Sequence, residues 1–147
     1  MRAVLQRVAR ARVLVDGEVT GEIGPGLLVY VGVARDDGIE QARWLARRLS
    51  ELRLFPDDEG RFDRSLLEAG GAALVVSQFT LFADTRRGRR PSFFDAAPPE
   101  VAEPLLEQLM EELRVLGVPV AGGRFGAHML VESENDGPVT ILLDSET

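Results

Sequence analysis

The chain has 147 residues, 45% of them hydrophobic and 28% charged, which suits a soluble globular protein of one domain. It contains no cysteine, no lysine and one histidine, His128, which excludes thiol nucleophiles, lysine Schiff bases and a two-histidine metal site within one chain. The formal net charge of −7 argues against a nucleic-acid binder unless the arginines are concentrated on one part of the surface.

The predicted elements begin with strands. Residues 2–15 carry regularly spaced apolar positions and predict a long strand, which Asp16-Gly17 turns into a returning strand over 18–23. Gly24-Pro25-Gly26 ends that strand, and the apolar run over 27–33 predicts a buried third strand. We therefore expect a three-stranded antiparallel meander.

Two helices follow at a distance from each other. Asp36 or Asp37 can cap a helix that begins near Gly38, where apolar residues recur at helical spacing. Pro98-Pro99 opens a second helix, and Gly117 suits its C-terminal cap. Both helices have one apolar face that can pack against a sheet.

Further strands are predicted near residues 72–76, 129–134 and 139–143. The expected fold is α+β: an antiparallel sheet with a barrel-like core and two main helices packed against it. Residues 1–147 are expected to form a single domain, because the sequence shows no linker, internal repeat or low-complexity tract.

Hydroxyl and amide side chains follow the predicted strand at 72–76. Ser77-Gln78-Phe79-Thr80 lies where that strand ends, and free backbone N–H groups at such an end can hold a carbonyl oxygen. The structural alternative is a strand in which Ser77 and Thr80 face solvent. An ordinary serine-hydrolase mechanism is not expected, because the sequence guarantees no histidine nearby to act as the base.

The arginines are partly concentrated in one segment, since four of the five residues over 86–90 are arginine. Such a patch can engage phosphates even on an acidic protein, because screening limits the reach of exposed charges to about 10 Å. With the proline, serine and two phenylalanines at 91–94, it is compatible with phosphate contacts and base stacking. A solvated loop or a subunit contact explains the pattern equally well.

Gly137-Pro138 lies between the last two predicted strands. Proline breaks strand pairing, and a cis X–Pro bond would aim neighbouring carbonyls in one direction, where they could hold an ammonium group. The alternative is a simple hairpin turn over 135–138. Upstream of this segment, Phe125 and Met129 could line a pocket, although core packing is their default role, and His128 is expected to be a surface or structurally satisfied histidine.

In combination these segments are specific, and the sequence resembles the D-aminoacyl-tRNA deacylase family (D-Tyr-tRNA deacylases) over essentially its whole length. Two signatures carry the resemblance, in the expected order: Ser77-Gln78-Phe79-Thr80-Leu81 and Asn135-Asp136-Gly137-Pro138-Val139-Thr140. The further matching segments are Leu5-Gln6-Arg7-Val8, residues 21–29, Val75-Val76, Arg90-Pro91-Ser92-Phe93 and Gly123-Arg124-Phe125-Gly126-Ala127.

The resemblance implies a homodimer with two active sites at the subunit interface. Gly137-Pro138 would be cis and would enter the partner's pocket, where its carbonyls would hold the substrate's α-amino group and leave no room for an L side chain. Arg7 would fix the orientation of that segment. Ser77-Gln78-Phe79-Thr80 would line the site of the terminal adenosine and the ester, and Phe125 and Met129 would contribute to the adenine pocket.

The implied reaction is hydrolysis of the ester that links a D-amino acid, or achiral glycine on tRNA-Ala, to the tRNA 3′ end. Thr80 could attack as a nucleophile, but the sequence offers it no evident general base. Alternatively, backbone N–H groups near Phe79 and Thr80 polarise the carbonyl while the tRNA's own 2′-hydroxyl assists. The resemblance and the shortage of catalytic side chains favour the second mechanism.

Two other functions stay open at this point. One is a non-catalytic RNA-binding module of the same fold that uses the arginine segment. The other is a related deacylase of mischarged L-aminoacyl-tRNA, which a trans Gly137-Pro138 bond would favour. For the deacylase that the resemblance implies, the expected partners are aminoacyl-tRNA (D-aminoacyl-tRNA and glycyl-tRNA-Ala) and a second copy of the chain.

No apolar run approaches the roughly 20 residues that span a bilayer, and the first residues lack the apolar stretch of a secretory signal. We expect a cytoplasmic protein without a membrane partner. We also expect no metal and no cofactor, so that catalysis depends on hydroxyls, backbone groups, arginines, carboxylates or the substrate itself.

Overall fold

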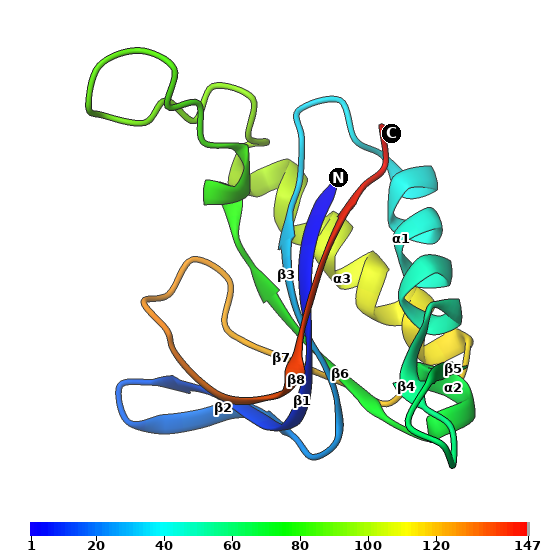
Figure 1. Ribbon diagram of the computed structural model, residues 1–147. Coiled ribbons are helices and arrows are strands. Elements are labelled where there is room, and N and C mark those ends of the chain that lie inside the picture. The colour runs from blue at the N-terminus through cyan, green and yellow to red at the C-terminus, as the bar shows by residue number, and fades with distance from the viewer. Residues whose placement is uncertain (147) are drawn as a thin grey trace.

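The long first strand organises the sheet. In the computed structural model, which describes residues 1–146, β1 (Arg2–Val15) pairs antiparallel with three other strands. β3 (Gly26–Gly32) lies along the first half of β1, and β2 (Glu18–Ile23) lies along the second half. β8 (Leu130–Asp144) covers the opposite edge over almost the whole length of β1 (Figure 1).

The expected meander is wrong in its strand order. The strands run in the order β2-β1-β3, so β1 and not β2 is central. The reason is length: β1 has 14 residues, whereas β2 has 6 and β3 has 7, so one edge of β1 accommodates both. The turn at Gly24-Pro25 carries the chain from one half of β1 to the other.

Two strands extend the expected antiparallel sheet beyond β3 in parallel pairing, which the sequence did not predict. β6 (Ala72–Ser77) pairs parallel with β3, and β7 (Val120–Gly122) pairs parallel with β6. Helices lie in the connections before each of these strands, and such crossovers produce parallel pairs.

The sheet curls towards a barrel, as expected. β2 approaches β7 closely enough that a Cβ atom on Gly21 would lie 2.2 Å from the carbonyl oxygen of Gly122. A glycine is therefore required where these two backbones meet. The contact brings the two ends of the strand order together around an apolar interior.

The strands alternate between two apolar clusters. Val29 of β3 and Val75 of β6 pack in the cluster beneath the helices. Leu28, Leu74 and Val76, one residue away along the same strands, pack in the second cluster with apolar side chains of β1. Because successive strand residues point to opposite faces, β3 and β6 are buried on both faces, as their continuous apolar runs require.

The two expected helices, α1 (Ile39–Glu51) and α3 (Pro99–Val115), lie side by side against one face of the sheet (Figure 1). Two shorter helical segments, α2 (Leu66–Ala69) and the 3₁₀ helix η1 (Phe79–Phe82), were not predicted, nor was the hairpin of β4 (Arg53–Pro56) and β5 (Phe62–Ser65). No helix in the described part of the chain is long and apolar enough to cross a membrane.

Asp37 does not cap α1, and neither does Asp36. The N-cap residue is Gly38, whose backbone N–H donates to Oε1 of Gln41 at 2.8 Å. The carboxylate of Asp37 instead accepts hydrogen bonds from the backbone N–H of Ala34 at 2.7 Å and from the amino group of Met1 at 2.9 Å. Asp37 therefore pairs with the distant amino group of Met1 and not, as the sequence suggests, with the first turn of α1.

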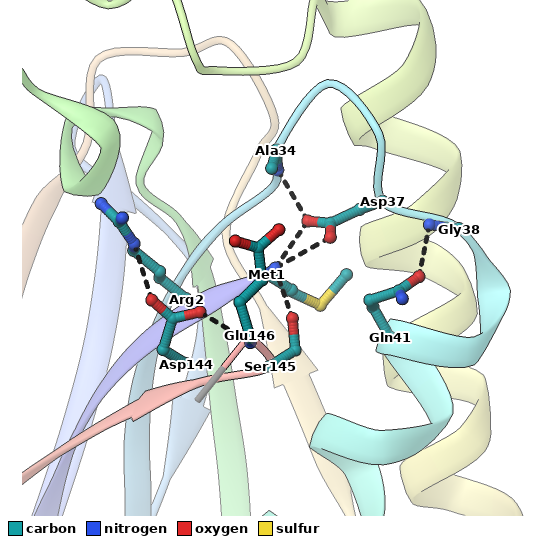
Figure 2. A network of polar contacts seen from close by, with 9 residues as sticks. All are labelled: Met1, Arg2, Ala34, Asp37, Gly38, Gln41, Asp144, Ser145 and Glu146. Carbon is teal, nitrogen blue, oxygen red and sulfur yellow. Dashed lines mark hydrogen bonds and ion pairs between the residues drawn. The ribbon is translucent and has the colours of Figure 1, made fainter.

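The amino group of Met1 ties three parts of the fold together (Figure 2). It lies 2.8 Å from Oδ2 of Asp37 in the loop after β3 and donates to Oγ of Ser145, which follows β8, at 2.8 Å. Met1 and Asp37 are almost fully buried, with side-chain exposures of 0% and 3%. The pair therefore joins the start of β1, the loop before α1 and the end of β8 at a largely buried position.

Replacing Asp37 tests this junction. In Asp37→Asn an amide oxygen can still accept from Ala34, but the buried ammonium loses its counter-charge. Breaking a buried ion pair in this way costs about 3–5 kcal/mol. We expect the free energy of unfolding, measured by urea denaturation, to fall by about 3 kcal/mol.

The matched control is Asp63→Asn, which removes an exposed carboxylate 3.9 Å from Arg53. Exposed ion pairs contribute about 0–1 kcal/mol, so this variant should unfold almost as the unaltered chain does. If the free energy of unfolding fell by the same small amount in both variants, the Met1–Asp37 pair would not stabilise the fold as described.

Candidate functional site

A cavity of about 590 Å³ opens where β6 ends. Its apolar wall comes from the end of β3, from the first turns of α3 and from the segment that leads into β8. Five of the residues predicted from the sequence line it: Ser77, Gln78, Phe79, Phe125 and Met129. Residues far apart along the chain are therefore brought to one place, as a binding site requires.

The end of β6 leaves two backbone donors unpaired, one of them on Phe79, which lines this cavity. The N–H of Gln78 still donates to the carbonyl oxygen of Val31 at 2.8 Å, after which the chain turns into η1. The N–H groups of Phe79 and Thr80 begin η1, and a helix offers its first N–H groups no internal acceptor. Neither N–H has an acceptor within residues 1–146. Both remain available to an external oxygen.

Thr80 occupies a different position from its three neighbours. Its side chain is exposed and is not among those that line the cavity. Its hydroxyl oxygen accepts a hydrogen bond from the side-chain amide of Gln78. An amide supplies no base for that hydroxyl, so the geometry gives Thr80 no means of activation as a nucleophile.

Aromatic side chains shape the mouth of the cavity. The rings of Phe79 and Phe93 meet edge to face, with centroids 5.0 Å apart and planes at 74°. Phe79 is 55% exposed, an unusual state for a phenylalanine, and it leaves a ring surface on which a nucleobase can stack. Phe93 was noted in the sequence only as part of the arginine segment. Its place in the cavity depends on the fold of the loop before it.

His128 also lines the cavity, although its side chain is exposed. The expectation of a surface histidine is confirmed. Its position at the cavity was missed, because the sequence around it contains no strong helix or strand pattern that would orient the side chain.

Gly137-Pro138 forms a bulge within β8 and not a hairpin turn. Thr140 pairs with Gln6 and Asn135 pairs with Val8, so residues 136–139 project from the ladder between two pairs with the same partner strand. Both halves of β8 run antiparallel to β1, which excludes the hairpin. The Gly137–Pro138 peptide bond is cis, as the resemblance implies, and both residues are exposed.

Arg7 anchors this bulge from inside the fold. Its Nε donates to the carbonyl oxygen of Asp136 at 2.9 Å, and its Nη1 donates to the carbonyl oxygen of Leu54 at 2.7 Å. The side chain of Arg7 is only 11% exposed, and its guanidinium lies 5.6 Å from the ring centre of Phe62. Hydrogen bonds to two fixed carbonyls on different elements leave the guanidinium little freedom.

The side chain of Asn135 closes the bulge from its other end. Its Oδ1 accepts from the N–H of Val139 at 3.0 Å, across the projecting residues. The exposed Gly137-Pro138 segment is therefore held at both ends. However, neither residue of this segment lines the cavity, and nor does Arg7. Within one chain, the cavity lined by Ser77, Gln78 and Phe79 and the segment Gly137-Pro138 therefore lie apart, although both were predicted to belong to one site.

A second cleft of about 550 Å³ lies along β1, β2 and β8. Four of its charged side chains form two ion pairs: Arg10 lies 3.0 Å from Glu134, and Arg12 lies 3.0 Å from Glu132. It contains none of the predicted site residues. Within residues 1–146, no group of three or more His, Asp or Glu side chains is arranged to hold a metal ion.

A rigid base supports the arginine segment next to the cavity. Asp84 and Ser92 exchange two backbone hydrogen bonds, of 2.7 and 2.9 Å. The guanidinium of Arg86 makes two hydrogen bonds to the carboxylate of Asp84, of 2.9 and 2.7 Å, and these lower the pKa of Asp84 to about 2. The carboxylate stays ionised above that pH, so the pair supports the loop at neutral pH and is lost only in strong acid.

The whole sequence is similar to those of known proteins. It matches the family described as D-Tyr-tRNA(Tyr) deacylase over residues 4–144. The chain belongs to this family. The family predicted from the two signatures is therefore confirmed.

Two similar relatives bear the name D-aminoacyl-tRNA deacylase. The one from Roseiflexus castenholzii is 63% identical over 145 residues, which cover 99% of this chain and 92% of the relative. The one from Symbiobacterium thermophilum is 60% identical over 146 residues, which cover 99% of this chain and 97% of the relative. At this coverage the D-Tyr-tRNA(Tyr) deacylase fold accounts for nearly all of the sequence.

Two solved structures have the same fold. A structure described as c-Myc DNA unwinding element binding protein superposes with a TM-score of 0.93 at 40% identity and covers 99% of both chains. A structure of a probable eukaryotic D-amino acid tRNA deacylase superposes with a TM-score of 0.83 and covers 97% of both chains. Its identity is 21%, so it supports the α+β fold alone.

Proposed function

We propose that the chain hydrolyses the ester of D-aminoacyl-tRNA, and of glycyl-tRNA-Ala, and releases free tRNA and the amino acid. The observation that carries this proposal is the cavity at the end of β6, lined by Ser77, Gln78 and Phe79 in a member of the D-Tyr-tRNA(Tyr) deacylase family. Its role in the cell would be to remove amino acids of the wrong chirality before translation uses them.

The cavity suits the 3′-terminal adenosine of a tRNA. Its volume of about 590 Å³ falls in the range of about 300–1,000 Å³ that is usual for small-molecule sites. Phe125 and Met129 offer an apolar surface and a polarizable sulfur to the adenine, and Phe79 offers an exposed ring face. With the adenine in this pocket, the ester carried by the ribose would lie near the end of β6.

The unpaired N–H groups of Phe79 and Thr80 would then stabilise the reaction. Water attacks the ester carbonyl carbon, and negative charge develops on the carbonyl oxygen, which accepts hydrogen bonds from these N–H groups. The bond from that carbon to the 3′-oxygen breaks. The 2′-hydroxyl takes a proton from the attacking water and gives its own proton to the departing 3′-oxygen. The protein supplies binding and electrostatic stabilisation, and the substrate supplies the proton relay.

Chirality would be read by Gly137-Pro138 from a second copy of the chain. The segment is exposed and anchored by Arg7, yet it lies outside its own chain's cavity. Carbonyl oxygens presented by a partner could hold the substrate's α-amino group, so that an L side chain would collide with the main chain. Glycine has no side chain to collide, which explains why glycyl-tRNA would also be accepted.

The surface of β8 supports such a homodimer. β8 pairs with β1 alone, and it exposes large apolar side chains: Leu130 is 62% exposed and Leu142 is 77% exposed. Within residues 1–146, β8 is therefore an edge strand of the sheet, and an edge strand can pair with another chain. The same strand carries Gly137-Pro138, so an interface at β8 would bring this segment to the partner.

A mass measurement tests the dimer. We expect sedimentation equilibrium to give twice the 16.1 kDa of one chain, and deacylase activity per chain to fall when dilution separates the subunits. The reason is that each cavity would lack the partner's Gly137-Pro138. A 16.1 kDa monomer with full D-specific activity would contradict the shared site.

A substitution at Gly137 tests the selectivity. Gly137 has φ +147°, and an added Cβ would lie 2.7 Å from Cγ2 of Val139 and 2.8 Å from its N atom. Gly137→Ala must therefore displace the main chain of the bulge. We expect the unaltered chain to deacylate D-tyrosyl-tRNA and to spare L-tyrosyl-tRNA. In the variant, the ratio of kcat/KM for the D substrate to kcat/KM for the L substrate should fall at least tenfold, which corresponds to about 1.4 kcal/mol.

Gly24→Ala is the matched control, because an added Cβ at Gly24 meets no atom within 4 Å. It should keep the D-over-L ratio. An unchanged ratio in Gly137→Ala would mean that the main chain is not the gate. If the unaltered chain instead bound tRNA tightly and left the D-ester intact, the non-catalytic RNA-binding module would be favoured.

Thr80→Ala separates the two mechanisms. The substrate-assisted mechanism predicts a modest loss in kcat, since the N–H of residue 80 is kept, and a 2′-deoxy substrate should lose much more. A nucleophilic Thr80 predicts loss of nearly all turnover with tRNA binding intact. Single-turnover kinetics on D-tyrosyl-tRNA, with binding measured separately, would distinguish these results.

A further inference from the structure

The loop between Asp84 and Ser92 projects from the body of the molecule, in green in Figure 1. It is closed at its base by the two Asp84–Ser92 hydrogen bonds, and Arg86 is held there by the Asp84 carboxylate. At its tip, Gly88 has a positive φ of 65°, and no atom lies within 4 Å of the place of a Cβ. The base of the loop is rigid, and its tip is surrounded by solvent.

Three arginines of this loop have no acidic partner. Arg87, Arg89 and Arg90 are exposed and form no ion pair with any carboxylate in residues 1–146. Many other arginines are neutralised, such as Arg12 by Glu132 at 3.0 Å. The loop thus carries three uncompensated positive charges on a protein whose formal net charge is −7.

The loop is attached directly to the candidate active site. It follows η1, which begins with Phe79, and it leads into Phe93, whose ring packs against that of Phe79 at the cavity. Phe79 and Phe93 both line the cavity, and a nucleic acid whose 3′ end occupies it would leave past these rings to reach the loop. The arginines are the uncompensated positive charges nearest in sequence to this exit.

We propose that Arg87, Arg89 and Arg90 bind backbone phosphates of the double-stranded stem next to the 3′ end of the substrate RNA. This inference rests on the proposed function. Guanidinium groups match phosphate oxygens in geometry and keep their charge at all physiological pH values. Phosphates would be repelled by much of the acidic surface, so attraction to a loop that adjoins the cavity in sequence would orient the stem as well as bind it.

A second copy of the chain is the competing partner for these arginines, since the surface elsewhere is acidic. The position of the loop favours RNA, because the loop follows η1 and leads into Phe93, which lines the cavity. A protein contact would appear as a change in oligomeric state when the arginines are replaced.

The test compares two double variants that each remove two exposed, unpaired arginines. Arg87→Gln/Arg89→Gln alters the loop, and Arg47→Gln/Arg48→Gln alters α1 by the same net charge. The probe is a fluorescently labelled hairpin RNA of an acceptor stem with a single-stranded CCA end, and a CCA trinucleotide is the second probe. Fluorescence anisotropy gives the Kd of each between about 50 and 200 mM KCl.

We expect the loop variant to bind the hairpin at least roughly tenfold more weakly near 0.1 M salt, and the slope of log K against log salt to fall by about 2. Its affinity for the trinucleotide should not change, and the α1 variant should match the unaltered chain with both probes. The proposal would be overturned if the two variants bound the hairpin with equal affinity and equal salt dependence. It would also be overturned if the loop variant bound the hairpin and the trinucleotide more weakly by the same factor.

A shift in sedimentation mass confined to the loop variant would also overturn it, in favour of a subunit contact. Because the probes carry no amino acid, the outcome does not depend on turnover. A chain that binds the hairpin through the loop but fails to hydrolyse D-tyrosyl-tRNA would refute the proposed function and keep the RNA surface.

Discussion

The fold depends on the pairing of β1 along both of its edges. The first half of β1 is hydrogen-bonded to β3 and the second half to β2, while β8 occupies the opposite edge. The ladder between β1 and β8 shifts register on both sides of Val8, and residues 136–139 project there. Arg7, next to that shift, reaches Asp136 and Leu54 with its guanidinium. One strand thus determines both the barrel-like sheet and the position of Gly137-Pro138.

This arrangement divides the chemistry between two places. The end of β6 supplies a cavity, two unpaired N–H groups and an exposed aromatic ring, whereas the bulge of β8 supplies rigid, exposed main chain. Neither place contains an activated nucleophile or a metal cluster within residues 1–146. Under the proposed function such a site selects and polarises an ester, and the 2′-hydroxyl of the substrate supplies the proton relay. Selectivity then comes from a second copy of the chain, because Gly137-Pro138 lies outside its own chain's cavity.

The charge distribution follows a similar division. Many arginines are neutralised by carboxylates, often across strands, as with Arg10 and Glu134 on β1 and β8. The three unpaired arginines of the projecting loop are concentrated beside the cavity mouth, where Arg86 and Asp84 make the loop's base rigid. An acidic protein can therefore present a local positive surface without a basic composition, because screening restricts each charge to its neighbourhood.

The sequence by itself determined the local elements: the strand over 2–15, the two long helices, the breaks at glycine and proline, and the family through its two signatures. These features depend on residues close together in the chain. Only the tertiary structure decided that β1 is central, that Asp37 pairs with the amino group of Met1, and that Gly137-Pro138 interrupts one strand. Those outcomes depend on pairings between residues tens to more than a hundred positions apart, for which local periodicity carries no information.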